Sequence, residues 1–143
     1  MSAINKLAFC IGLLIAATVS AHDVKPATVL RVIDGDTVEI TADWIIPPLE
    51  PKLSLRVLGI DTPEKGFRAK CGREIELGLK ATEYTTATVA TAKKIRVDIQ
   101  EWDKYGGRVL GELYLDGQPL SQLLINEGLA AKYNGRAKKS WCN

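Results

Sequence analysis

Histidine is nearly absent from this sequence, and neither a bilayer-length apolar run nor a large excess of one charge is present. The only histidine is His22, so the body of the chain has no histidine base and no Ser-His pair for a serine nucleophile. Lys and Arg total 19 against 17 Asp and Glu, so any affinity for an anionic polymer must come from local clusters rather than from bulk charge. The length and ordinary composition are those of one domain.

The first 21 residues have the pattern of an export signal. Lys6 supplies a positive charge, Leu7 to Val19 form an apolar run of 13 residues, and Val19-Ser20-Ala21 is a small-residue cleavage site. Because roughly 20 residues are needed to span a bilayer, a membrane anchor is the weaker alternative. We therefore expect residues 1–21 to be a cleaved signal peptide. Residues 22–143 would form one domain that is periplasmic or secreted from a bacterium, without stable membrane association.

Two cysteines remain after this cleavage, Cys71 and Cys142. An even number of cysteines in an oxidising compartment favours a disulfide. Such a bond would close a loop of about 70 residues, which the chain-entropy model values at roughly 4 kcal/mol. Two free thiols are the alternative.

Positive charge gathers at two places in the chain. The first group, at 65–73, contains no acid, and the second follows the last acid, Glu127. Their members are Lys65, Arg68, Lys70 and Arg73, and Lys132, Arg136, Lys138 and Lys139. Such groups are more often solvated surface than a binding site, and both interpretations stay open at this point.

Apolar and β-branched residues with partial alternation predict five strands, at 27–33, 37–42, 53–60, 94–100 and 109–115. Helical spacing predicts one helix over 72–92, despite a Thr-rich end of poor helix propensity. A shorter second helix would have Pro119 in its first turn and end before Gly128. This order of elements predicts an α+β domain built on a small closed barrel.

Acidic residues stand at two predicted strand ends. Asp36 follows the first strand, and Asp61-Thr62-Pro63-Glu64 follows the third. Two carboxylates and a backbone carbonyl are oxygen ligands of the kind that calcium prefers. Either motif alone is more often a turn or a loop cap than a metal site, so the inference depends on their combination.

Two arginines accompany these acids. Arg56 lies inside the third predicted strand, and Arg108 opens the fifth. A charged residue amid apolar strand residues must be paired, functional or turned to the surface. Without a histidine, a carboxylate base, arginines and a metal ion are the groups that remain for phosphoryl chemistry.

These motifs, in this order, resemble the staphylococcal nuclease (thermonuclease-like) family. Residues 33–38 read IDGDTV, residues 55–64 read LRVLGIDTPE, and residues 103–108 read DKYGGR. The resemblance covers roughly residues 27–133, and together the motifs are far more specific than any one of them. The Ser-Trp-Cys ending, together with Cys71, resembles exported bacterial branches of the family.

The resemblance implies a five-stranded OB-type β-barrel with two to three helices. It implies calcium held by Asp36, Asp61 and the Thr62 carbonyl, and it implies that Glu64 acts on an attacking water. The substrate would be DNA, RNA or both, cut as by an endonuclease to leave 3′-phosphate ends. Because one chain contains the whole site, a monomer is expected.

The resemblance also assigns residues to the substrate. Arg56 and Arg108 would bind the phosphate and offset the charge that develops on it, while Lys104 would contact a terminal phosphate. Tyr105 and Tyr133 would contact the nucleotide, and stacking on either is worth about 1–3 kcal/mol per base.

One departure from the family pattern concerns Arg108, because Gly106-Gly107 inserts one residue before it. Its role is therefore carried over less firmly than that of Arg56, although glycines give the turn room to compensate. Two other functions stay open: a non-catalytic OB-type nucleic-acid-binding module, and an exported domain whose acids bind calcium only for stability. The joint presence of the acids and both arginines argues against the first.

Overall fold

The computed structural model describes residues 22–143, so the expected signal peptide lies outside the described part. The elements are β1 (Lys25–Pro26), β2 (Thr28–Asp34), β3 (Thr37–Thr41), β4 (Leu53–Val57), β5 (Ile60–Asp61), α1 (Gly72–Thr91), β6 (Ile95–Trp102), β7 (Arg108–Leu115), β8 (Gln118–Pro119), α2 (Leu120–Asn126) and β9 (Ala131–Lys132). Neither helix within 22–143 combines the length and the apolar character needed to cross a bilayer.

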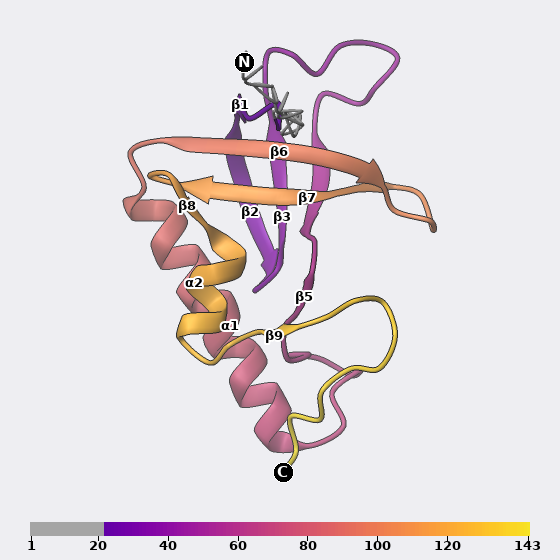
Figure 1. Ribbon diagram of the computed structural model, residues 1–143, viewed down its shortest axis with the longest axis vertical. Helices are drawn as coiled ribbons and strands as arrows, with labels where there is room; N and C mark the ends of the chain where they lie inside the picture. Colours follow the sequence, from indigo (N-terminus) through magenta and orange to yellow (C-terminus); the bar gives the residue numbers. More distant parts are fainter. Residues whose placement is uncertain (1–21) are drawn as a thin grey trace, which may run out of the picture.

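The main sheet curls until its two ends meet. Its strand order is β1-β6-β7-β4-β3-β2, and β1 and β2 are consecutive pieces of chain on either side of Ala27. The Ala27 N–H donates to the Ile95 carbonyl at 3.2 Å, so this one stretch closes the sheet. In Figure 1, β6 and β7 cross over β2, β3 and β4, with both helices beneath. The α+β, OB-like barrel predicted from the sequence is confirmed.

A parallel contact in this sheet brings the two arginine-bearing strands together. β4 lies parallel to β7, and Ser54 pairs with Arg108 while Arg56 pairs with Leu110. On its other side β4 is antiparallel to β3, where Arg56 pairs with Thr37. Arg56 therefore lies between Arg108 on one neighbouring strand and the Asp36 turn on the other.

The barrel is filled by the inward side of each strand. Along β7, exposure alternates residue by residue, as a strand with one buried face requires. The core consists of Val38, Ile40, Leu53, Leu55, Val57, Ile60, Val97, Val109, Leu113, Leu115, Leu120, Leu124 and Ala130. Two members of this set, Leu120 and Leu124, belong to α2 and pack this helix into the same core.

Helix α1 continues through its Thr-rich end to Thr91. Thr85 is fully buried, and its hydroxyl donates to the Gly35 carbonyl at 2.6 Å. The hydroxyls of Thr82, Thr86 and Thr88 donate to carbonyls four residues earlier. These contacts satisfy polar groups that otherwise lower helix propensity, so packing on the barrel outweighs local preference.

Two expected boundaries were wrong. The strand predicted over 53–60 stops at Val57, and the chain then leaves the main sheet so that β5 pairs with β9. The chain turns out of the main sheet at Gly59, whose φ of 80° is left-handed, and the Gly59 carbonyl then accepts from the Tyr133 N–H at 2.9 Å. Pro119 is the N-cap of α2, with extended backbone at ψ 130°, rather than a residue of its first turn.

Candidate active site

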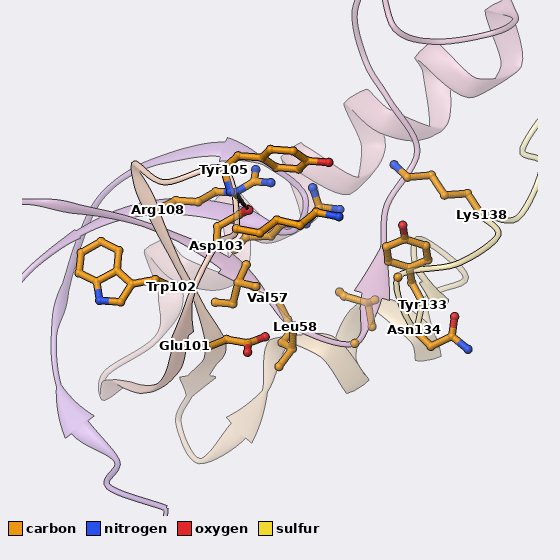
Figure 2. A pocket seen from close by; sticks show the side chains of 16 residues that line it. Val57, Leu58, Glu101, Trp102, Asp103, Tyr105, Arg108, Tyr133, Asn134 and Lys138 are labelled. Atoms are coloured by element: carbon orange, nitrogen blue, oxygen red, sulfur yellow. Dashed lines mark hydrogen bonds and ion pairs between the residues drawn. The ribbon is translucent and has the colours of Figure 1, made fainter.

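A cavity of about 670 Å³ opens beside the β4–β5 segment, the β6–β7 turn and the segment that follows β9. Six of its lining residues bear on function: Arg56, Lys104, Tyr105, Arg108, Tyr133 and Lys138. In Figure 2, Trp102, Asp103, Tyr105 and Arg108 reach it from one side and Tyr133 and Lys138 from the other. A cavity with convergent cations and aromatic rings is suited to an anionic aromatic ligand.

Arg56 is held by the two buried aspartates expected from the sequence. One of its Nη atoms lies 3.3 Å from Asp61 Oδ1 and 3.5 Å from Asp36 Oδ2. Both aspartates are only 4% exposed, whereas Arg56 remains partly open to the cavity. The Thr62 N–H donates to Asp36 Oδ2 at 3.4 Å, which ties the two acidic turns together. The structure thus gathers Asp36, Asp61, Thr62 and Arg56 at one place.

Burial raises the pKa of the Asp36 carboxyl above its usual value. The Arg56 guanidinium and the Thr37 hydroxyl, which donates to Oδ1 at 2.9 Å, pull this pKa down, and the Asp61 carboxylate pushes it up again. Asp36 and Asp61 share the Arg56 guanidinium, and Lys138 Nζ lies 2.8 Å from Asp61 Oδ1, so two cations face the two buried carboxylates.

Arg108 is oriented by Asp103 across the β6–β7 turn. Arg108 Nε donates to Asp103 Oδ2, and the backbone N–H of Asp103 donates to Arg108 O at 3.0 Å. A hydrogen bond from the Tyr105 N–H, followed by the bond from Arg108, lowers the Asp103 pKa. Our sequence analysis quoted Asp103 only as part of a motif and missed this role.

The inserted glycine does not remove Arg108 from the cavity. Gly106 and Gly107 have φ of 72° and 75°, a left-handed conformation that glycine adopts without steric cost. The turn absorbs the additional residue in these two glycines. Arg108 therefore lines the cavity despite the inserted residue.

Glu64 is partly exposed, with a side chain 35% accessible, and its backbone is held by Glu74. Glu74 Oε1 accepts from the Glu64 N–H at 3.4 Å, and Oε2 accepts from the Lys70 N–H at 2.7 Å. Glu74 itself is 7% exposed, in the first turn of α1. Sequence reasoning missed Glu74, although an acid in the first turn of a helix is a recognisable signal.

Three aromatic side chains surround the cavity. Tyr105 is 81% exposed, and Lys104 Nζ lies 5.0 Å from the centre of its ring. Tyr133 stands across from it in Figure 2. Trp102, 55% exposed, adds a third ring that our sequence analysis did not single out. His22 has no part in this wall, since its Nδ1 lies 2.6 Å from Asp98 Oδ2.

A comparison with known proteins now decides the family. The sequence profile described as staphylococcal nuclease homologue matches residues 54–141. This chain belongs to the staphylococcal nuclease family.

Individual relatives agree with this family. A "Thermonuclease" of Staphylococcus hyicus is 34% identical over 104 residues, 71% of this chain and 56% of that protein. An "Uncharacterized endonuclease" of Escherichia coli is 31% identical over 106 residues, 73% of this chain and 59% of that one. The "SPbeta prophage-derived endonuclease YokF" of Bacillus subtilis is also 31% identical, over 72% of this chain and 32% of its own length. This chain spans little more than half the length of the first two relatives.

The C-terminal segment of this staphylococcal nuclease family member is fastened to the site. Cys71 and Cys142 form a disulfide with Cα atoms 5.9 Å apart, the arrangement favoured from the sequence. Between β9 and this bond, Lys138 Nζ lies 2.8 Å from Asp61 Oδ1 and 3.7 Å from Glu64 Oε1. Sequence analysis placed Lys138 in a basic group without assigning it to the acids.

The other members of the two basic groups lie elsewhere. Lys65 Nζ is 3.3 Å from Asp34 Oδ1 and also donates to the Ile33 carbonyl. Arg68 stacks on exposed Phe67, and Lys139 lies 4.6 Å from the Trp141 ring. Lys138 is the one member of these groups in the cavity wall among residues 22–143.

The aspartates of this family member suit a hard divalent cation. Within residues 22–143 no three His, Cys, Asp or Glu side chains are grouped as metal ligands. A calcium ion would be held by the Asp36 and Asp61 carboxylates, the Thr62 carbonyl and water. The all-oxygen donor set of two carboxylates and a backbone carbonyl fits such an ion.

Proposed function

We propose that the protein is a calcium-dependent nuclease that hydrolyses phosphodiester bonds of DNA or RNA. The observation that carries this proposal is the convergence of Arg56 and Arg108 in one cavity, beside buried Asp36 and Asp61. Two guanidinium groups match the oxygens of a phosphodiester, and each can donate two hydrogen bonds. The relatives named above, a thermonuclease and endonucleases, support the same activity.

Glu64 is the proposed base. It stands next to the acidic pair, and its partly exposed side chain is accessible to water. Its carboxylate would take a proton as the water oxygen attacks phosphorus, the bond from phosphorus to the 5′ oxygen would break, and the released 5′ oxygen would take a proton from solvent water. The products are a 3′-phosphate and a 5′-hydroxyl. A bound calcium ion would supply positive charge that stabilises the phosphoryl transition state.

The cations in the cavity have separate tasks in this proposal. Arg56 and Arg108 bind the phosphate and offset the charge that grows on its oxygens in the transition state. Asp103 holds the Arg108 guanidinium by a hydrogen bond to Nε. Because that bond occupies Nε, the two Nη groups of Arg108 remain to reach the substrate.

The aromatic rings favour a nucleotide over a simple phosphate as the ligand. Tyr105 and Tyr133 line the same cavity as the arginines, so a base can stack while its phosphate is bound. Lys104, whose Nζ lies 5.0 Å from the centre of the Tyr105 ring, would contact a further phosphate. The cavity is larger than a single phosphate requires, as its volume of about 670 Å³ shows.

We also propose that the protein works outside the cytoplasm as a monomer, after removal of residues 1–21. The disulfide supports this location, because such bonds persist in the periplasm and outside cells and are rare in the cytosol. Mass determination of the protein purified from the culture medium or periplasm tests the cleavage after Ala21.

The activity is tested by digesting single-stranded DNA and RNA with purified protein, in calcium and then in excess chelator. The matched variant is Glu64→Gln, which keeps shape and removes the base. We expect calcium-dependent cleavage, 3′-phosphate ends, and a loss of about 10²–10⁴-fold in turnover in the variant. A fully active Glu64→Gln protein would contradict the proposed base. A folded protein that binds oligonucleotides and cuts none would instead identify a binding module.

A further inference from the structure

Lys138 places a second cation on an oxygen that the proposed metal ion would need. Its Nζ lies 2.8 Å from Asp61 Oδ1, and an Arg56 Nη atom lies 3.3 Å from the same oxygen. Lys138 also lies 3.7 Å from Glu64 Oε1. The ammonium thus contacts both the proposed metal ligand and the proposed base.

The segment that carries Lys138 is confined at both ends. At the start, Tyr133 N–H donates to Gly59 O at 2.9 Å, next to the β5–β9 pair. At the end, Cys142 is bonded to Cys71 at the beginning of α1, and Trp141 is only 6% exposed. Figure 1 shows this segment leaving β9 in a wide loop and returning to the N-terminal end of α1. No helix or strand is assigned in it, so these end contacts hold it.

We propose that Lys138 is a tethered cation that competes with a divalent metal ion for the Asp61 carboxylate, and that the Cys71–Cys142 disulfide sets the strength of this competition. The inference rests on the proposed function, in which Asp36 and Asp61 are the metal ligands. It adds a residue that sets how much metal the nuclease needs.

The physical argument concerns effective concentration and repulsion. A group tethered beside its partner acts as though present at about millimolar concentration or more, so the ammonium re-forms its contact whenever the ion leaves. A divalent cation near Asp61 also repels the ammonium. Once displaced, Lys138 remains in the cavity wall, where an incoming phosphate is the next available anion.

The test is direct calcium binding by titration calorimetry, without substrate, on wild-type protein, Lys138→Gln and Arg136→Gln. Arg136 is the matched control, because it is an exposed cation of the same segment without an ion pair within residues 22–143. We expect Lys138→Gln to bind calcium about three- to tenfold more tightly, the range expected when one partly exposed ion pair no longer competes. Arg136→Gln should bind as the wild type does.

A second arm tests the tether. Replacing Cys71 and Cys142 by alanine should tighten calcium binding when Lys138 is present and change it little in the Lys138→Gln background, since both changes remove the same competition. Circular dichroism checks the fold of these variants. If the alanine pair is unfolded, the Lys138→Gln comparison decides the competition alone.

The outcomes separate this inference from the proposed function. Wild-type protein that binds calcium no less tightly than Lys138→Gln overturns the competition while leaving the calcium site intact. An equal gain in Arg136→Gln overturns it as well, because the effect would then be one of general charge. Absence of calcium binding in all three proteins overturns the calcium site, and with it the inference.

Discussion

The Glu74 carboxylate joins the start of α1 to the loop that carries Glu64. One of its oxygens accepts the Glu64 N–H at 3.4 Å and the other accepts the Lys70 N–H at 2.7 Å. Because Glu74 is buried, water cannot replace these bonds when the acceptor is removed. The proposed base therefore depends on an acid that takes no part in the chemistry itself.

Replacing Glu74 by alanine should lower both stability and turnover. Two backbone donors lose their acceptor, so we expect a loss of about 1–3 kcal/mol in the free energy of unfolding. Glu74→Gln keeps one acceptor oxygen and should lie between the alanine variant and wild type. Urea unfolding and the kcat for DNA cleavage measure the two effects. Glu76→Gln, an exposed acid of the same helix, is the control, and an equal loss in it would contradict the assignment.

Gly78 lets α1 approach the loop that carries Pro63 and Glu64. A Cβ added there would stand 2.7 Å from both the Pro63 carbonyl oxygen and the Glu64 carbonyl carbon. Alanine normally stabilises a helix interior by about 1 kcal/mol relative to glycine. Here we expect Gly78→Ala to destabilise the protein and to reduce kcat, because backbone atoms must move.

The control for this prediction is Gly72→Ala, at the first position of α1. Nothing lies within 4 Å of a Cβ at Gly72, so this change should leave unfolding in urea nearly unaltered. A Gly78→Ala protein as stable and active as the Gly72→Ala protein would show that the loop yields without cost.

The stability of the β6–β7 turn should depend on acid through Asp103. The Tyr105 N–H and Arg108 hold the folded-state pKa of Asp103 below its usual value. A lowered folded pKa means that the ionised group stabilises the fold above the unfolded pKa, about 3.9, and that this stabilisation is lost as pH falls through the folded pKa. Wild-type protein should therefore lose stability below about pH 4.

Asp103→Asn should lose less stability over this acid range, since it has no carboxylate to protonate. Free energies of unfolding in urea at pH 5, 4, 3 and 2.5 compare the two proteins. The same variant should also reduce kcat near neutral pH, because Arg108 loses its charged partner. Parallel pH profiles for the two proteins would show that Asp103 does not contribute this stability.

Reduction of the Cys71–Cys142 disulfide should lower the melting temperature. The bond spans a sequence separation of 71 residues, and a loop of this size is worth about 4 kcal/mol in the chain-entropy model. Differential scanning calorimetry with and without reductant measures the shift. The protein with both cysteines replaced by alanine should melt near the reduced wild type and should not respond to reductant.

The sequence alone determined the fold class and most of the candidate site. Strand positions were predicted from local alternation, and the acidic residues were identified as candidates because they stand just after predicted strands. Both patterns depend on residues that are close together in the chain. The family motifs then placed Arg56, Arg108 and the tyrosines, and the structure brings these residues into one cavity.

Only the tertiary structure decided the rest. The parallel β4–β7 pair, the break after Val57 and the Thr-rich half of α1 each depend on hydrogen bonds between distant segments. The contacts of Lys138 with Asp61 and Glu64 likewise join parts of the chain that are far apart in the sequence. Such contacts form because the closed barrel and the disulfide offset the entropy of ordering the segments between them.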